Sequence, residues 1–436
     1  MIKKIVLCLL VLSCIGSTAQ EKTRFRKIDS LLTYLNSNNK FMGQLSIREG
    51  DNVVFSKAYG LPQSQSKPDG YTKYKIGSVT KTFTAVMIVQ LVEEKRLKLE
   101  DKLSKFYPQI PNADKITIND LLRHRSGILD YVNADSTVNM MAKVSKKEMI
   151  AKIAAYPSVF EPNSKAEYSN SNYYLLGCII EDLTKVSYAT NLKNRITNRL
   201  KLKNTYMVDK VDVNRNESYS YIYDGSKWNL FPEWDMSLPF AAGGITSNAN
   251  DLTAFMRGLF NGKLLKQSSS LEEMTKLNQS YGIGLVTFPF GERKFYGHTG
   301  GIEGYKSVVG YYPTEKLGIS LIVNGDNFNR NDIMIGILSI YYKMPFPFPN
   351  LTSLKVDENI LKNYVGVYAS KDLPLKITVK IEKGELIAQA TGQSAFPLNA
   401  ISDTEFTFDS AGLNMIFGEK TLLLKQGGME FKFVKE

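Results

Sequence analysis

Ser78 and Lys81 lie three residues apart at the start of an apolar segment that runs to Lys95. On a helix, residues three apart share a face, and the first turn offers free backbone N–H groups and the positive end of the helix dipole. Because burial disfavours an ammonium ion, a buried lysine loses its charge readily, and its amine can then take a proton from a serine hydroxyl. The pair could therefore form an activated serine nucleophile. The spacing is also compatible with an ordinary helix N-cap at Ser78, and it recurs in polar sequence at Ser37 and Ser64.

A second candidate group is the triplet Tyr168-Ser169-Asn170. A lysine ammonium lowers the pKa of a nearby tyrosine, so Tyr168 could act as a general base and later protonate a leaving group. The Asn170 amide could hydrogen-bond both a lysine and a substrate carbonyl. The triplet follows Pro162 and precedes an apolar segment at Tyr173, which favours a loop braced by the core. The alternative is a loop tyrosine followed by a helix cap. The same Tyr-x-Asn spacing occurs at Tyr34 and Tyr131.

The third group is the glycine-rich segment Gly297-His298-Thr299-Gly300-Gly301. A strand edge made of threonine and glycines lets a substrate lie against the backbone. Its N–H groups could face that of Ser78 and form an oxyanion hole. The last four residues of the segment are therefore candidate substrate-binding residues, and the alternative is a glycine-rich turn.

Taken together, the three segments resemble the serine β-lactamase and penicillin-binding protein superfamily. The likeness is greatest for the branch of class C β-lactamases, D-alanyl-D-alanine carboxypeptidases and related esterases and D-aminopeptidases. The motifs of that branch are S-x-x-K, Y-x-N and K-T-G or H-x-G, in this order. The corresponding segments here are Ser78-Val79-Thr80-Lys81, Tyr168-Ser169-Asn170 and His298-Thr299-Gly300. The resemblance extends over roughly residues 25–342 and includes the phrases Leu121–Gly127, Tyr173–Gly177 and His298–Gly304.

This resemblance implies a role for each residue. Ser78 would attack a carbonyl and become acylated, while Lys81 and Tyr168 would share the proton transfers. Asn170 would position the lysine and the substrate. The backbone N–H groups of Ser78 and Gly301 would form the oxyanion hole, and Tyr168 would activate the water that releases the acyl group.

One residue departs from the β-lactamase pattern. His298 stands where those enzymes carry lysine, and a histidine is neutral much of the time at neutral pH. It is therefore less suited to binding a substrate carboxylate, which favours an esterase or a D-aminopeptidase-like hydrolase. The alternatives are a β-lactamase or D-alanyl-D-alanine carboxypeptidase, and a non-catalytic penicillin-binding protein. The only other histidine, His124, is expected to be structural.

The elements that must position these residues follow from the periodicity of the chain. Apolar helical patterns separate strand patterns near both ends of the first 343 residues, which predicts an α+β domain with an antiparallel sheet flanked by helices. This agrees with the β-lactamase/transpeptidase-like fold that the resemblance implies. Short strands separated by turns follow a proline-rich break and predict a small all-β domain, faintly similar to lipocalin-like barrels. The predicted organisation is a signal peptide at 1–19, a hydrolase domain at 20–343, a linker at 344–351 and an all-β domain at 352–436.

The first residues are typical of an export signal, with Lys3 and Lys4 before an apolar stretch and small residues before Gln20. The protein is expected to be periplasmic or secreted, and a lipoprotein anchored at Cys14 is the less favoured alternative. The stretch is short for a membrane span, so no stable span is expected after cleavage. Only Cys178 would remain, as a buried residue.

The formal net charge is +12, but the basic residues are scattered along the sequence. This distribution is typical of a solvated surface and does not indicate a nucleic-acid partner. The expected partner is a small-molecule or peptide substrate, and the cell wall is one source of such a substrate. No spacing of metal ligands is visible, so neither a metal nor another cofactor is expected.

Overall fold

The computed structural model of the 436-residue chain describes residues 23–61, 67–134 and 139–436. Its contacts divide the chain into two compact units, Met42–Gly325 and a second unit that joins Met1–Phe41 to Asp326–Glu436. The predicted signal peptide and Cys14 lie outside the described residues. The predicted domain boundaries stay predictions.

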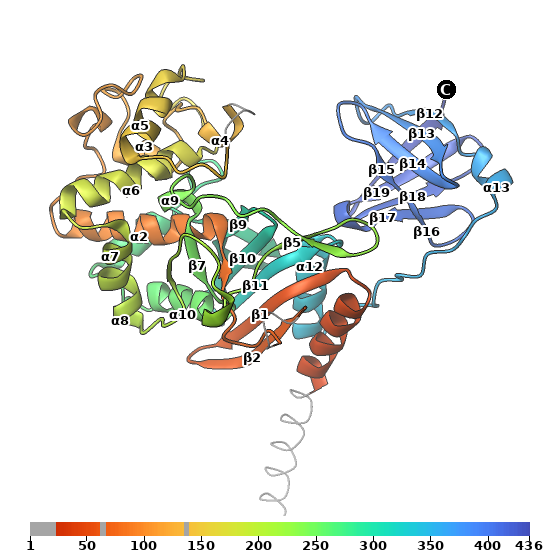
Figure 1. The fold of residues 1–436 in the computed structure, drawn as a ribbon, viewed down its shortest axis with the longest axis horizontal. Helices are drawn as coiled ribbons and strands as arrows, with labels where there is room; N and C mark the ends of the chain where they lie inside the picture. Colours follow the sequence, from red (N-terminus) through yellow and green to blue (C-terminus); the bar gives the residue numbers. More distant parts are fainter. Residues whose placement is uncertain (1–22, 62–66, 135–138) are drawn as a thin grey trace, which may run out of the picture. The chain divides into compact units, whose positions relative to one another are not determined.

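A six-stranded sheet runs through the first unit in the order β2-β1-β11-β10-β9-β8 (Figure 1). Its strands are β1 (Phe41–Glu49), β2 (Asn52–Tyr59), β8 (Val286–Phe290), β9 (Arg293–Ile302), β10 (Tyr305–Tyr312) and β11 (Leu317–Asp326). The hairpins β1/β2, β8/β9, β9/β10 and β10/β11 are antiparallel, as the sequence predicted for this sheet. Both faces of β11 are buried, which explains its continuous run of apolar residues.

Two small sheets accompany the large one. The first has the order β3-β7-β4, and its middle strand is antiparallel to both neighbours. Its strands are β3 (Tyr74–Lys75), β7 (Ile245–Ser247) and β4 (Tyr206–Met207). The second is the hairpin of β5 (Tyr221–Tyr223) and β6 (Trp228–Leu230).

The helix α2 (Thr80–Glu93) occupies the middle of this unit, where it packs against α6 and α9 (Figure 1). All of its residues up to Leu91 are buried, so the prediction of a buried helix after Ser78 is confirmed. The other helices of the unit are α3 (Ile118–Leu122), α4 (Tyr131–Ala134), α5 (Lys146–Ala155), α6 (Asn170–Thr184), α7 (Tyr188–Leu192), α8 (Asn198–Leu200), α9 (Phe240–Gly243), α10 (Ala249–Phe260) and α11 (Ser268–Thr275).

In the second unit, the helix over residues 23–37 buries Ile28, Leu31, Leu32 and Leu35, which recur at helical spacing. The unit also contains α12 (Arg330–Tyr341) and α13 (Glu358–Lys362). Leu31 and Phe346 both lie close to Gly336 of α12, where a side chain would clash with them. The proline-rich segment therefore packs against helices of its own unit.

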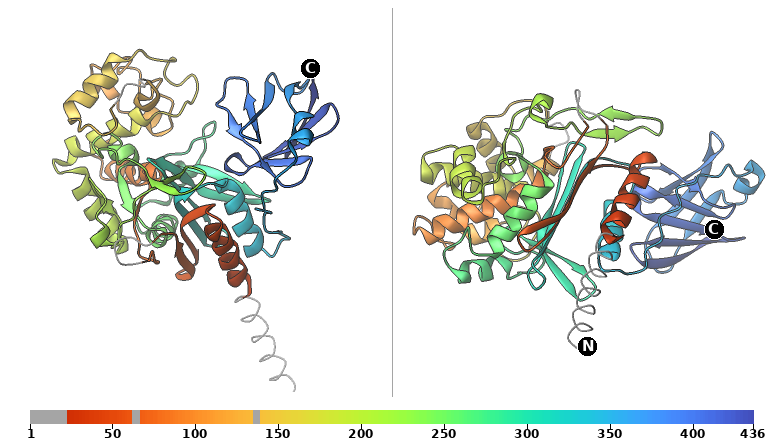
Figure 2. Two further views of the ribbon diagram at one scale, coloured as in Figure 1. Left: turned by 45° about the vertical axis from the view of Figure 1, so that its right-hand side comes forward. Right: turned by 90° about the horizontal axis from the view of Figure 1, so that it is seen from below.

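The rest of this unit is a nine-stranded, nearly closed sheet, seen in dark blue from two further directions in Figure 2. Its order is β15-β14-β13-β12-β20-β19-β18-β17-β16. The strands are β12 (Gly366–Ala369), β13 (Lys376–Glu382), β14 (Glu385–Ala390), β15 (Phe396–Pro397), β16 (Asn399–Ala400), β17 (Glu405–Phe408), β18 (Leu413–Phe417), β19 (Thr421–Gln426) and β20 (Met429–Lys435). The segment 396–400 pairs with β14 through its first half and with β17 through its second, so it joins the two edges. The predicted all-β fold of this region is confirmed.

Candidate active site

Ser78 lies in a short 3-10 turn, η1 (Gly77–Val79), that joins β3 to α2. The residue before it, Gly77, has a φ of +57°, which disfavours any residue with a side chain. A Cβ at this position would also lie 2.7 Å from the backbone nitrogen of Gly301. The glycine therefore allows the nucleophile candidate to sit directly against β9.

The Lys81 side chain is fully buried on α2. Its Nζ lies 3.1 Å from Ser78 Oγ, 2.7 Å from Asn170 Oδ1 and 2.7 Å from the carbonyl oxygen of Ala242. Burial lowers the pKa of Lys81 to about 7, although the charge of Asp130 acts in the opposite direction. A neutral amine has two N–H bonds and one lone pair. If the two N–H groups donate to the two carbonyl oxygens, the lone pair is left for the hydroxyl proton of Ser78.

Tyr168 contacts the same oxygen, because its hydroxyl donates a hydrogen bond of 2.9 Å to Ser78 Oγ. Burial raises the pKa of Tyr168, despite its hydrogen bond to Ser78. The expectation of a lowered pKa is therefore wrong for the resting site, because burial of the phenol, together with the nearby charge of Asp130, disfavours the phenolate. The resting tyrosine is a proton donor.

Asn170 starts α6, and its amide is oriented by Asp130, a residue that the sequence analysis missed. Asn170 Nδ2 donates to both carboxylate oxygens of Asp130, at 3.1 and 2.9 Å, and the Asn170 backbone nitrogen donates to one of them at 3.1 Å. The amide nitrogen therefore faces the carboxylate, and the amide oxygen faces Lys81. The only sequence signal for Asp130 was its place just after the phrase that ends at Gly127.

The ring of His124 packs against the ring of Tyr168. The Ser169 backbone N–H donates to His124 Nδ1 at 3.1 Å, and the ring centroids of His124 and Tyr168 are 4.4 Å apart. His124 has a φ of +57° and is buried, and burial lowers its pKa well below the usual value, so the ring is neutral. This arrangement is the structural role that the sequence indicated.

The glycines of β9 lie against the turn that carries Ser78. A Cβ added to Gly300 would lie 2.0 Å from the carbonyl oxygen of Ile76 and 2.9 Å from the backbone nitrogen of Ser78. Gly301 is its neighbour and pairs with Lys306 of β10. The structure thus places Gly300 and Gly301 beside Ser78, as the oxyanion-hole hypothesis requires.

His298 and Thr299 lie on the same strand, opposite Val309 and Val308. The His298 ring is buried, and its centroid is 6.4 Å from that of Tyr168. Burial and the nearby charge of Lys81 lower the pKa of His298 to about 4. Its Nδ1 lies 2.5 Å from the Thr299 carbonyl oxygen, which fixes the proton on Nδ1 and leaves Nε2 as an acceptor. The third motif therefore presents a neutral group and not a cation.

A substitution at Gly300 tests the close approach of β9 to the turn. Gly300→Ala is expected to lower the free energy of unfolding by about 2 kcal/mol or more, because its methyl group would overlap two backbone atoms. Gly301→Ala is the matched control, since its added Cβ would have no heavy atom within 4 Å. Urea unfolding of both variants checks the difference. Equal stability of the two would contradict the described contact between β9 and η1.

Asp130→Asn tests the orientation of Asn170. The variant keeps one acceptor for Asn170 Nδ2 but loses the negative charge that raises the pKa of Lys81. Since the pKa of Lys81 should fall, the acidic limb of the pH–kcat/KM profile is expected to move to lower pH. The value at its plateau should decrease about tenfold through looser positioning. An acidic limb that stays at the native pH would show that Asp130 does not act on Lys81.

Among the described residues, no group of histidine, cysteine, aspartate or glutamate side chains could hold a metal ion. In the same ranges, no helix is both long and apolar enough to cross a membrane.

The fold and the arrangement of the candidate active-site residues agree with the result of a comparison with known protein families. The family model described as Beta-lactamase matches residues 40–338, so the chain belongs to this family. The chain is a serine hydrolase of the β-lactamase-related type, as the resemblance of its motifs predicted.

Two related proteins are similar to this chain over most of its length. The chain is 25% identical over 456 residues to a penicillin-binding protein of Bacillus subtilis (strain 168), covering 95% of this chain and 99% of the relative. It is 27% identical over 323 residues to the teichoic acid D-alanine hydrolase of Staphylococcus aureus (strain NCTC 8325 / PS 47), covering 71% and 78%.

Two solved structures show the same fold. The D-stereospecific amidohydrolase from Streptomyces sp. has a TM-score of 0.61 at 26% identity, and the match covers 69% of this chain and 94% of that one. The octameric penicillin-binding protein homologue from Pyrococcus abyssi has a TM-score of 0.65 at 24% identity, covering 94% and 99%. The second match extends over both units and concerns the fold alone.

Proposed function

We propose that the protein is a secreted serine hydrolase that forms an acyl-enzyme on Ser78 and cleaves ester or amide bonds of D-amino acyl groups. One observation carries the proposal. Ser78 Oγ lies 3.1 Å from the amine of Lys81 and 2.9 Å from the hydroxyl of Tyr168, so a proton acceptor and a proton donor contact the same oxygen.

Acylation follows from these contacts. The Lys81 amine takes the Ser78 proton as Oγ attacks the substrate carbonyl, and the backbone N–H groups of Ser78 and Gly301 receive the developing oxyanion. Tyr168 then gives its proton to the leaving alcohol or amine. The acyl-enzyme therefore contains a Lys81 ammonium beside a Tyr168 phenolate.

Deacylation returns both protons. In the acyl-enzyme the Lys81 ammonium, 4.8 Å from the Tyr168 ring centroid, stabilises the phenolate that burial disfavours at rest. The phenolate takes a proton from water, and the resulting hydroxide attacks the acyl carbonyl. Ser78 Oγ leaves and recovers its proton from Lys81, so the resting protonation states are restored.

The charges of the site support the choice of substrate class. His298 is neutral at pH 7 because its pKa is lowered to about 4, and Lys81 is half-neutral with a pKa of about 7. Behind this pair, the carboxylate of Asp130 accepts a hydrogen bond from Asn170. A substrate carboxylate would meet no permanent cation among these groups, whereas the ammonium of a D-amino acyl group would be attracted. The similarity of the chain to a teichoic acid D-alanine hydrolase and to a D-stereospecific amidohydrolase supports the same class.

Mass spectrometry tests the proposal directly. The protein would be incubated with a fluorophosphonate and separately with a penicillin, followed by intact-mass measurement and peptide mapping. A fluorophosphonate adduct on Ser78 without a lasting penicilloyl adduct is expected, and D-alanyl ester turnover would then be assayed. A stable penicilloyl adduct on Ser78 would instead favour the non-catalytic penicillin-binding alternative, and an adduct on another serine would overturn the nucleophile assignment.

His298→Lys tests the third motif. The variant places an ammonium where the structure has a neutral ring, so relative activity on carboxylate-bearing substrates is expected to rise about tenfold, the effect of one charge-assisted hydrogen bond. The ratio of kcat/KM for a D-alanyl-D-alanine peptide to that for a D-alanyl ester measures it. An unchanged ratio would contradict the assignment of His298 to the substrate site.

Export is part of the proposal and rests on the basic and apolar character of the first residues alone. N-terminal sequencing of the mature protein tests it, with a start at Gln20 expected. A mature protein that begins at Met1 would argue against export by a cleaved signal, and a lipid-modified Cys14 would favour the lipoprotein alternative.

A further inference from the structure

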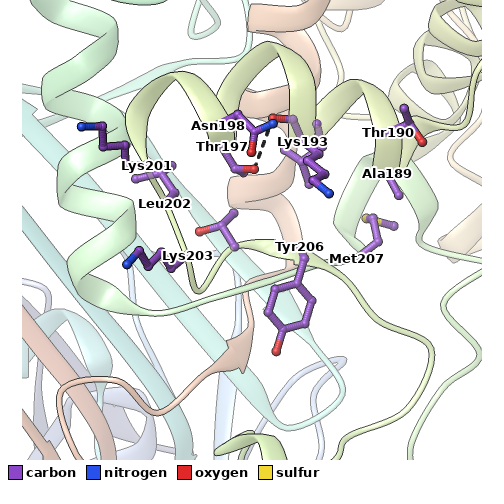
Figure 3. Close-up of a pocket in the computed structure, with 12 residues that line it drawn as sticks. Ala189, Thr190, Lys193, Thr197, Asn198, Lys201, Leu202, Lys203, Tyr206 and Met207 are labelled. Carbon is purple, nitrogen blue, oxygen red and sulfur yellow. Dashed lines mark hydrogen bonds between the residues drawn. The ribbon is translucent and has the colours of Figure 1, made fainter.

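Two adjoining cavities lie away from Ser78, around α7, α8 and α10. One, of about 660 Å³, is lined by Lys193, Lys201 and Lys203 together with polar and apolar residues of the segment 189–207 (Figure 3). The other has a volume of about 430 Å³. The two share Lys201 and Leu202 and therefore form one continuous surface. We call it the basic surface; its cationic residues include Arg48, Arg199, Lys201, Lys203, Arg257 and Lys263.

The positive charge of this surface is poorly compensated. Its one lining carboxylate, Asp251, is buried and accepts hydrogen bonds from Asn204 N at 2.8 Å and Thr205 Oγ1 at 2.9 Å. Within the described ranges, Lys201, Lys203 and the other exposed lysines of the surface form no ion pair. The net charge of the lining is therefore strongly positive.

Two arginines, Arg48 and Arg257, line the second of the two cavities. Arg257 pairs with Asp51, while its Nε is buried and has no hydrogen-bond partner in the described part of the chain. Arg48 donates to the backbone oxygen of Asp51 at 2.8 Å and to Thr253 Oγ1 at 3.3 Å, so both guanidinium groups contact Asp51 but only Arg257 pairs with its carboxylate. Burial and the charge of Arg257 lower the pKa of Arg48, as expected for neighbouring like charges, and the charge of the buried Asp251 offsets this only in part. A bound anion would relieve this repulsion.

The chemistry of the lining favours phosphate. Guanidinium groups match the oxygens of phosphate with paired hydrogen bonds, and lysines add point charges along the path of a chain. A single-stranded nucleic acid would also need aromatic faces for its bases. The one aromatic lining residue, Tyr206, has its ring covered by the Arg215 guanidinium at 4.7 Å and its hydroxyl bonded to Glu217.

We propose that the basic surface binds a linear polymer of phosphodiester-linked units and thereby holds the polymer whose D-amino acyl esters the enzyme cleaves. The inference rests on the proposed function for the identity of the ester, but the binding itself is independent of Ser78. Two adjoining cavities lined by separated cations suit repeated anionic groups better than a single small anion.

Binding of fluorescently labelled long-chain polyphosphate tests the surface. In Lys201→Gln/Lys203→Gln/Lys263→Gln, the affinity is expected to fall at least about tenfold and the slope of log K against log salt to decrease by about two. The matched control is Lys98→Gln/Lys147→Gln/Lys185→Gln, which removes the same charge from exposed positions elsewhere. An equal loss in both variants, or no binding by the native protein, would overturn the proposal. Tighter binding of oligothymidylate at the same surface would assign it to nucleic acid instead.

Kinetics separate this proposal from the proposed function. On a small D-alanyl ester, both triple variants should keep kcat/KM within about twofold, because the altered lysines lie outside the catalytic contacts. On D-alanylated poly(glycerol phosphate), only the basic-surface variant should lose about tenfold in kcat/KM. Ser78→Ala should bind polyphosphate normally. Undiminished hydrolysis by Ser78→Ala, or a native protein that binds polyphosphate but hydrolyses neither ester, would refute the catalytic proposal alone, whereas equal activity of both triple variants on the polymer would refute the role of the basic surface.

Discussion

Ser78→Ala is expected to reduce kcat for ester hydrolysis by about 10⁴-fold or more, since loss of a nucleophile removes the covalent route entirely. The structure explains why no neighbouring group should replace it. Lys81 is confined by Asn170 and Ala242, and the Tyr168 hydroxyl is held as a proton donor by a raised pKa. Steady-state kinetics on a D-alanyl ester, together with fluorophosphonate labelling, measures the effect.

The chain supplies a matched control for this substitution. Ser37 also precedes a lysine by three residues, but it lies exposed at the end of the helix over residues 23–37. Ser37→Ala should retain full activity and full labelling. Substantial hydrolysis by Ser78→Ala would assign the nucleophile elsewhere and remove the basis of the proposed mechanism.

Lys81→Met is expected to lower kcat by about 10³-fold or more, because it removes the proton acceptor while keeping a buried side chain of similar length. In the native protein, the amine form is the base, so activity should rise with pH through the lysine pKa of about 7. The pH–kcat/KM profile should therefore show an acidic limb near that value. It should be flat in this range for the residual activity of the variant.

Folding and chemistry must be distinguished in the Lys81 variant. The substitution leaves the oxygens of Asn170 Oδ1 and Ala242 without their lysine partner, which costs about 1–3 kcal/mol of stability. Thermal unfolding measures that cost. A folded variant with native kcat would show that Tyr168 alone activates the serine.

Local patterns predicted much of the fold. The strands β13, β14 and β17 to β20 lie where alternation and turn residues indicated them, and α2 is buried as its apolar sequence predicted. Such elements are set by side-chain periodicity and turn residues, which act over a few positions.

Predictions failed where distant segments supply the hydrogen bonds. The local pattern over residues 118–128 is typical of one helix that ends near Gly127, but α3 ends at Leu122. Beyond it, the carbonyl groups of His124 and Arg125 accept from the backbone nitrogens of Glu167 and Asn163. After Leu122 the chain therefore leaves the helical conformation and pairs with the segment that carries Tyr168. Local helix propensity does not predict this pairing, because the partner segment is distant in the sequence.

The sequence by itself determined which residue types form the candidate site and their order along the chain, because motif spacing depends on neighbouring positions. It also indicated that the third motif is uncharged, from the identity of His298. The tertiary structure decided the role of Asp130, the resting protonation of Lys81 and Tyr168, and the joining of lysines and arginines into the basic surface. These depend on burial and on contacts between residues as far apart as Arg48 and Arg257, and only the folded chain brings such residues together.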